Sequence, residues 1–405
     1  MSDAAQADLR GAPASRRLKL LRPFANRDFR VLWTGMAISL LGDGIYLVAI
    51  AWQVFELSNT PAALGLVGVA TMLPTVALVL LGGVITDRFE RRRVLIAADL
   101  IRGAAVTGIG LLAISGHLQL WHVFALVACF GVGDALFGPA FRSLVPELVP
   151  ADQLVQANAL EQMARPAVRL VGPAIGGFVV HFLGAGTAFL FDAGSFGCSI
   201  GALLLLTPRP FRRERERSGS SVAADLVEGF GFVRTQAWLW GTLALVLVVN
   251  MLGGVLFVLV PYMVKNKLDA SAAGLGLVYS VGAVGAISGS LLLSQLDLPR
   301  RHVTVMYSLW AGAALSAACY ALVGILVPRE MLGRVTSVDW LFTLGLVPAS
   351  YALVGPIADA VGVAETFAVA GIVAGVLPFV FLLLIPTIRS TERERLVPAD
   401  GLARD

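Results

Sequence analysis

A short charged segment, residues 83–93, separates two long apolar runs and constrains the fold more than any other feature of the chain. Six of its eleven residues ionise, and four of these are arginines, whereas the flanking residues 62–82 and 94–98 carry no charge. Two membrane helices joined as a hairpin need a charged turn in the headgroup region, and clustered arginines place that turn on the cytoplasmic side. The segment therefore predicts an integral membrane protein with this turn facing the cytoplasm.

Composition agrees with this prediction, since 57% of the residues are hydrophobic and the mean hydropathy is +0.80. A soluble globular chain has about 45–50% apolar residues. The net charge of +4 comes from basic residues in loops and tails, so it indicates membrane topology and anionic lipid rather than a nucleic-acid partner. The cysteines at 129, 198 and 319 lie inside apolar runs, where we expect buried small side chains and neither a disulfide nor a metal site.

Eleven apolar runs have about the 20 residues that a spanning helix needs. They lie at 31–55, 62–86, 94–115, 120–141, 160–183, 186–206, 237–263, 271–296, 303–327, 335–360 and 364–388. Arginines occur in the loops 87–93, 142–159, 207–236, 297–302 and 328–334, and are absent from the loops 56–61, 116–119 and 184–185. This pattern places the N-terminus in the cytoplasm, and Lys265 and Lys267 on the outer side are its one exception. The basic segment 1–30 shows no sign of a cleavable signal peptide.

The predicted fold class is all-α integral membrane, with two six-helix-type repeats. The longest polar stretch, residues 207–236, divides the chain, and we expect it to be disordered at 209–221 and amphipathic from Asp225 to Trp238. The predicted domains are a cytoplasmic N-terminal tail (1–30), an N-terminal transmembrane repeat (31–206), a cytoplasmic linker (207–236), a C-terminal transmembrane repeat (237–388) and a C-terminal tail (389–405).

The C-terminal repeat is expected to lack its fourth helix, which leaves about eleven spans. Residues 148–150 and 326–328 both have the sequence Leu-Val-Pro, and Gly-Ala-Ala occurs at both 103–105 and 312–314. The matched points are 45 residues apart in the first half and 14 in the second, and the difference (45 − 14 = 31) is one helix with its loop. Eleven clean crossings would put the basic C-terminal tail outside, so we expect 303–327 not to cross cleanly and the tail to remain inside.

Asp43 is the ionisable residue that lies deepest in a predicted span, about 18 Å from its start at 1.5 Å per residue. Since the apolar core is about 30 Å thick, this carboxyl would lie near the bilayer midplane. Gly42 and Gly44 flank it, which would loosen the helix and let another group approach. We expect Asp43 to carry a coupled proton; the alternative is a carboxylate that pairs with an arginine of a neighbouring helix for packing.

Other polar residues within the spans are weaker candidates for the proton or substrate pathway, or are expected to be structural. Asp134 lies about 12 Å from the inner end of its run and is a second candidate for the proton or substrate pathway. Asn250 is in the middle of the seventh run, where it would line a cavity or bond another helix. Asp99 and Arg102 are three residues apart and are expected to pair with each other near the inner surface. Three aspartates near span ends are expected to be structural: Asp192, Asp339 and Asp359.

The charged segment has the pattern G-x-x-x-D-R-x-x-R-R, which resembles the loop signature between the second and third helices of the major facilitator superfamily. The resemblance implies that five residues form a conformational latch on the cytoplasmic side: Gly83, Asp87, Arg88, Arg91 and Arg92. The sequence departs at Glu90, where the family often has glycine. An ordinary basic loop is the alternative.

A second resemblance lies in the fifth run, where Gly172, Pro173, Gly176 and Gly177 are similar to the G-P-x-x-G-G antiporter signature of exporters in that superfamily. Val168 stands where the wider signature has a glycine, and close helix packing is the alternative interpretation. Further stretches resemble the branch that contains macrolide and multidrug exporters and enterobactin-type siderophore exporters: residues 138–140, 148–150, 157–160, 191–196 and 228–234.

These resemblances imply a secondary exporter of small amphipathic organic compounds, of drug or siderophore type, that works by proton antiport with alternating access. It would be a monomer in the plasma membrane, with a small molecule, a proton and the bilayer as partners and with no cofactor. The chain contains no phosphate-binding loop and no H-E-x-x-H motif, and its four histidines lack ligand spacing, which argues against an ATP-driven pump, a metal site and an enzyme. A degenerate, non-transporting relative is the alternative, because one helix is missing.

Overall fold

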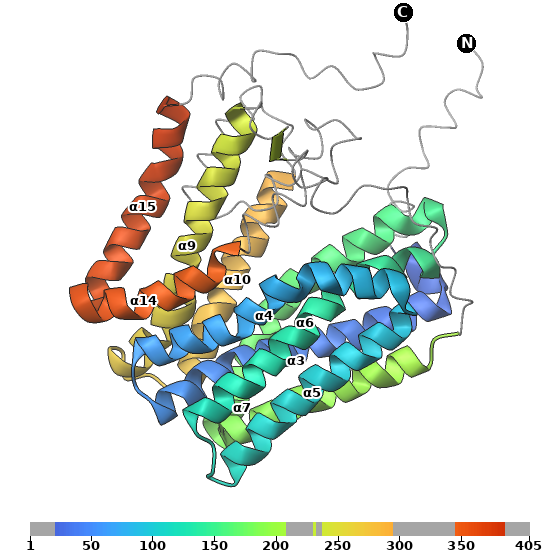
Figure 1. Cartoon of the computed structure of the whole chain (residues 1–405), viewed down its shortest axis with the longest axis horizontal. Helices are drawn as coiled ribbons and strands as arrows, with labels where there is room; N and C mark the ends of the chain where they lie inside the picture. Colours follow the sequence, from blue (N-terminus) through green and yellow to red (C-terminus); the bar gives the residue numbers. More distant parts are fainter. Residues whose placement is uncertain (1–20, 208–229, 232–236, 295–344, 385–405) are drawn as a thin grey trace, which may run out of the picture. The chain divides into compact units, whose positions relative to one another are not determined.

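The computed structural model describes residues 21–207, 230–231, 237–294 and 345–384, and every regular element within these ranges is a helix (Figure 1). Seven of the described helices are long and apolar enough to cross a membrane. Two shorter apolar stretches, Ala272–Gly285 and Val347–Val361, accompany them. The span predicted at 303–327, most of the linker and most of both tails lie outside the described residues, so the number of crossings stays a prediction.

The helices follow the predicted apolar runs. Their bounds are α3 (Arg27–Leu57), α4 (Pro61–Arg88), α5 (Arg91–Ile114), α6 (Leu120–Leu148), α7 (Leu154–Leu204), α9 (Ala237–Asn266), α10 (Ala272–Ser294), α14 (Val347–Val361) and α15 (Val363–Leu384), with short 3-10 helices at Arg22–Ala25 and Ala151–Gln153. In α7, Gly184 alone interrupts the helix with φ 83°. The spans predicted at 160–183 and 186–206 are therefore two helices that meet at a kink at Gly184, and the label α7 covers both.

Two features differ from the sequence predictions. The fourth span, predicted to end at 141, continues as α6 to Leu148 through Pro139 and Pro146, because neighbouring helices in a membrane protein can satisfy the backbone groups that a proline frees. Cys129 and Cys198 are exposed, so the prediction that they are buried is wrong. An apolar run does not show which face of a helix is turned inward, since the other face meets lipid.

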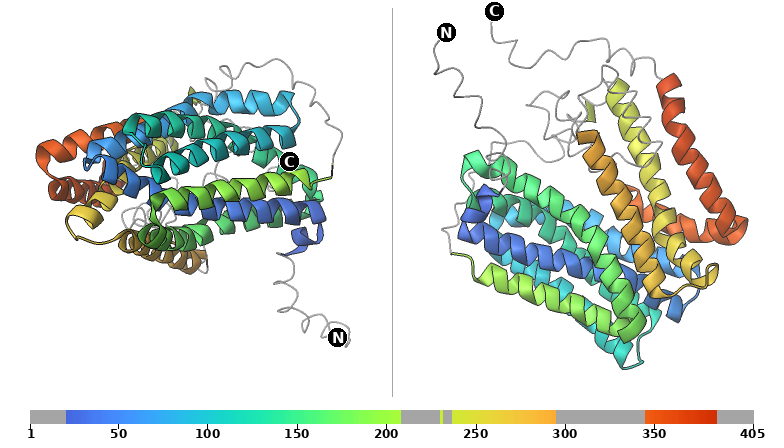
Figure 2. Two further views of the ribbon diagram at one scale, coloured as in Figure 1. Left: turned by 90° about the horizontal axis from the view of Figure 1, so that it is seen from below. Right: turned by 180° about the vertical axis from the view of Figure 1, so that it is seen from behind.

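The chain forms two compact units. The first comprises residues 1–215 with 260–284, and the second comprises residues 216–259 with 285–405. Within the first unit α3 packs along α7, α4 along α6, and α5 against both α6 and α7 (Figures 1 and 2). Within the second unit, buried apolar side chains join α9 to α14 and α15, among them Leu259, Val354 and Ala370.

Small residues allow α3 and α7 to approach closely. A Cβ atom added to Gly35 would lie 2.6 Å from the Cβ of Ala202, and one added to Gly44 would lie 2.7 Å from the Cα of Gly172. Helices in lipid associate mainly through such close packing and through interhelical hydrogen bonds, because lipid tails are as apolar as leucine. The close approach brings polar side chains of α3, α5, α6 and α7 into one interior.

Candidate functional site

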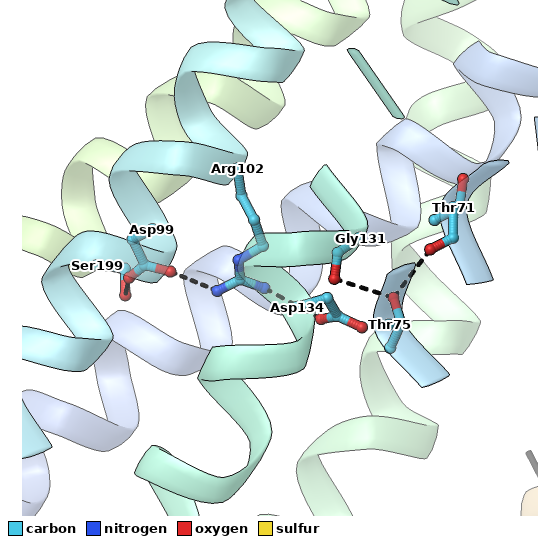
Figure 3. A network of polar contacts seen from close by, with 7 residues as sticks. All are labelled: Thr71, Thr75, Asp99, Arg102, Gly131, Asp134 and Ser199. Atoms are coloured by element: carbon cyan, nitrogen blue, oxygen red, sulfur yellow. Dashed lines mark hydrogen bonds and ion pairs between the residues drawn. The ribbon is translucent and has the colours of Figure 1, made fainter. Parts of the chain in front are cut away.

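A buried ion pair on α5 forms the centre of this interior. Arg102 is 2% exposed and Asp99 is 0% exposed, and the guanidinium Nη2 donates to Oδ1 of Asp99. The other carboxylate oxygen, Oδ2, accepts a hydrogen bond of 2.7 Å from the hydroxyl of Ser199 on α7. The pairing predicted from the three-residue spacing is confirmed, and both oxygens of Asp99 have partners (Figure 3).

The rest of the Arg102 side chain is enclosed by α6 and α7. Its Nη1 lies 3.7 Å from Oδ1 of Asp134, whose side chain is 42% exposed. The rings of Phe137 and Phe196 lie 4.1 and 4.8 Å from the guanidinium carbon, so cation–π attraction adds to the ion pairs. A Cβ atom at Gly133 would come within 2.6 Å of Cγ of Arg102, which explains why α6 has a glycine there.

Asp43 reaches the same group of charges from α3. It is partly buried, and it interacts electrostatically with Arg102 and with Asp192 of α7. The glycines beside it do not loosen α3, which is continuous from Arg27 to Leu57. They permit close contact instead, since Gly42 packs against the side chains of Asp192 and Ser195, and Gly44 against the backbone of Gly172.

Asp192 is the member of this group that sequence reasoning missed. Its place near the start of the span predicted at 186–206 gave no sign that it lies among these charges, where it is 0% exposed; the structural role predicted for it stays a prediction. The hydroxyl of Ser195 donates to its Oδ1 at 3.2 Å. The sequence feature that could have indicated this position is a spacing. Asp192, Ser195 and Ser199 follow one another at three and four residues, so they share one face of α7.

Hydrogen bonds extend the network to α4. The hydroxyl of Thr75 lies 3.0 Å from the carbonyl oxygen of Gly131 on α6 and 2.9 Å from that of Thr71 on its own helix (Figure 3). Gly131 packs directly against the backbone of Thr71. Because Gly131 is three residues before Asp134, the contact fixes the α6 turn that presents this carboxylate to Arg102.

The antiporter-like motif lies between two helices of the first unit. Gly172 and Gly176 pack against the backbone of α3, and Gly177 packs against Ala273 and Gly276 of α10. The carbonyl oxygen of Pro173 also lies against Gly276. Ser280 of α10 donates to the carbonyl oxygen of Leu170 at 2.6 Å. The motif therefore packs closely against neighbouring helices, which is the alternative that the sequence left open beside an antiporter signature.

The charged segment joins the start of α5 to the ends of two other helices. Arg91 forms an ion pair with Glu147 at the end of α6, and Nη2 of Arg92 donates to the carbonyl oxygen of Leu204 at 2.8 Å. A cation suits the last carbonyls of a helix, which have no partner within the helix and carry partial negative charge. Gly83 and Asp87 lie in the last turns of α4, and Arg88 ends that helix.

Two predicted features involve α9. Asn250 is partly buried in the middle of this helix, in the second unit, and its place on a pathway stays a prediction.

At the end of α9, the amides of Asn266 and Asn59 exchange hydrogen bonds of 2.6 and 3.0 Å. Lys265, one of the lysines that break the charge pattern, has its ammonium 5.2 Å from the ring centre of Trp52. This cation–π contact gives the exceptional lysine a structural partner.

The long apolar helices and the buried charges between them are those of a multi-pass membrane transporter. A family model described as "Transmembrane secretion effector" matches residues 19–325, and the chain belongs to this family of the major facilitator superfamily. Members of this superfamily are transporters and not enzymes. The resemblance to drug exporters drawn from the sequence motifs is confirmed.

Curated relatives extend over most of the chain. The multidrug efflux pump Tap of Mycolicibacterium fortuitum is 26% identical over 366 residues, which cover 80% of this chain and 88% of that protein. Macrolide efflux protein A of Streptococcus pyogenes is 23% identical over 377 residues, covering 85% and 92%. These relatives identify the chain as an efflux transporter of the plasma membrane that acts on small molecules.

Solved structures of transporters are similar to this all-helical fold. The bacterial homologue of the lysosomal transporter spinster, in an inward-facing and unoccupied conformation, aligns with a TM-score of 0.60 and 15% identity over 92% of this chain and 98% of that one. A bacterial homologue of the iron transporter ferroportin, also inward-facing, gives a TM-score of 0.61 and 16% identity over 88% and 98%.

Proposed function

We propose that this protein exports small amphipathic organic compounds, of drug or siderophore type, in exchange for protons by alternating access of its two halves. The names of its relatives, a multidrug efflux pump and a macrolide efflux protein, support substrates of drug type. In this proposal the protein works as a monomer, with its N-terminus in the cytoplasm.

The observation that carries the proton coupling is an excess of carboxylates around one cation. Arg102 interacts with four carboxyl groups: Asp43, Asp99, Asp134 and Asp192. If all four were ionised, this interior would hold a net charge of −3 among the described residues, which is too costly in a medium that excludes water. This cost supports a site that binds protons or a cationic compound, and exchange of one for the other is antiport.

Asp43 is the carboxyl that we propose to exchange its proton with the aqueous side. Asp99 is fully enclosed and has partners on both oxygens, whereas Asp43 is only partly buried. Asp134, more exposed and 3.7 Å from Arg102, is the second member of the pathway. Asn250 is assigned to the substrate pathway in the second unit.

The latch and the antiporter-like motif complete the proposal. Arg91 and Arg92 join the start of α5 to α6 and α7, so these contacts would break when the transporter changes access. Gly83, Asp87 and Arg88, at the end of α4, are assigned to the same latch. The dense packing of Gly172, Pro173, Gly176 and Gly177 would oppose proton leakage along α7.

Proteoliposomes with an imposed pH gradient test this function. Wild-type protein should drive uphill movement of a macrolide or a fluorescent cationic dye when the gradient is applied. Asp43→Asn should lose the uphill component and keep downhill movement, whereas Asp359→Asn, at an exposed aspartate of α14, should match the wild type. Gradient-driven transport that is unchanged in Asp43→Asn would exclude Asp43 as the coupling group. A wild type without gradient-driven transport would favour the non-transporting alternative.

A further inference from the structure

The two fully buried aspartates of the first unit have different surroundings. Asp99 has a cation on one oxygen and a hydroxyl on the other. Asp192 has the hydroxyl of Ser195 at 3.2 Å on Oδ1, while its Oδ2 is buried without a hydrogen-bond partner among the described residues. A buried carboxylate needs a cation or several donors, whereas a protonated acid needs far less compensation.

The charged groups that face Asp192 do not supply this compensation. From α5, Arg102 acts on it only through space, because the guanidinium contacts Asp99 and Asp134 instead. From α3, Asp43 brings a second carboxyl and no cation. Tyr46, also on α3, has a buried hydroxyl with no hydrogen-bond partner in the described part of the chain.

The packing holds Asp192 in this position. Gly42, the residue before Asp43, lies directly against Oδ1 of Asp192 and the side chain of Ser195. A larger residue than glycine at 42 would push α7 away from α3. The arrangement therefore keeps water away from Asp192 while placing a partly exposed carboxyl, Asp43, one residue from the contact.

From this geometry we infer that Asp192 is a proton-binding residue, and that it holds the coupled proton in this conformation while Asp43 passes that proton to and from the aqueous side. The inference rests on the proposed proton antiport. In the transfer, the O–H bond at Asp192 breaks and an O–H bond forms at an oxygen of Asp43. The negative charge moves from Asp43 to Asp192, and the total charge of the pair does not change.

Infrared spectroscopy of the purified full-length protein tests where the proton is bound. A protonated carboxylic acid has a carbonyl stretch that a carboxylate lacks, so the wild type should show this band and Asp192→Asn should lose it. Asp134→Asn, at the half-exposed carboxyl beside the same arginine, should keep it. A band of wild-type intensity in Asp192→Asn would overturn the inference.

A matched pair of serine variants keeps the test decisive if Asp192→Asn folds poorly. Ser195→Ala removes a hydrogen bond that stabilises ionised Asp192, so the band should persist to higher pH than in the wild type. Ser199, on the same helix as Ser195, donates the equivalent hydrogen bond to Asp99 of α5. Ser199→Ala removes that bond and should leave the pH dependence of the band unchanged. A band that moves with Ser199→Ala and not with Ser195→Ala would contradict the assignment.

Transport separates this inference from the proposed function. In proteoliposomes, Asp192→Asn should lose gradient-driven accumulation and keep downhill movement, because asparagine imitates the protonated acid. Loss of the infrared band with normal gradient-driven transport would show that the coupled proton does not pass through Asp192. If the wild type itself showed no gradient-driven transport, the proposed antiport would fail, whereas the band would still decide whether Asp192 is protonated.

Discussion

Asp99 and Asp134 contact the same arginine in different environments, which predicts very different costs for the same substitution. Asp99→Asn leaves the Arg102 guanidinium, 3% exposed in its side chain, without its main counter-charge. Removing one partner of a buried ion pair costs about 3–5 kcal/mol. Asp134→Asn removes a longer contact of 3.7 Å from a side chain that is 42% exposed, and such pairs are worth about 0–1 kcal/mol.

Unfolding in mixed micelles with increasing SDS, followed by tryptophan fluorescence, measures both costs. The double variant Asp99→Leu with Arg102→Met removes both charges, so its cost should be smaller than that of Asp99→Asn alone. Equal free energies of unfolding for the two single asparagine variants would refute the reasoning, since burial would then not determine the strength of the pair. A double variant that costs the sum of its parts would refute it as well.

Two further predictions rest on contacts of α7 and α5, and a third rests on the charge pattern of the sequence. Gly172→Ala should impair transport because its Cβ would lie 2.8 Å from Cα of Gly44, whereas Gly201→Ala on the same helix has open space and should be tolerated in the same efflux assay. Arg92→Ala should slow turnover with little change in substrate affinity, while Arg93→Ala, whose side chain is 82% exposed, should have a smaller effect in stopped-flow transport. A cysteine introduced by Ser390→Cys should resist a membrane-impermeant reagent in intact cells; rapid labelling would show that the C-terminal tail lies outside.

Sequence patterns predicted the local features of this fold well. The apolar runs located the helices of the first half, and the three-residue spacing of Asp99 and Arg102 gave their ion pair. Both features depend on positions within one helix, whose geometry is known in advance.

The features that were missed depend on contacts between helices. Depth along a span favoured Asp43 over Asp192, yet burial of Asp192 depends on a glycine of α3, at position 42, more than a hundred residues away in the chain. The outward faces of Cys129 and Cys198 could not be predicted for the same reason, because both faces of a membrane helix can be apolar. The meeting of Asp43 and Asp134 at Arg102 also required three helices to be placed together.

The glycine joint at 184 has a mechanical consequence for α3. Residues two apart on a helix point to nearly opposite sides, and Gly42 and Gly44 accordingly contact different helices of α7, one carrying Asp192 and the other carrying Gly172. Asp43 stands between them. Since a single residue joins the two helices, neither can slide freely past the other, and relative movement of the helices acts on α3 within one residue of Asp43. Asp43 is thus placed where a displacement of either helix of α7 would act on the neighbouring residues of α3.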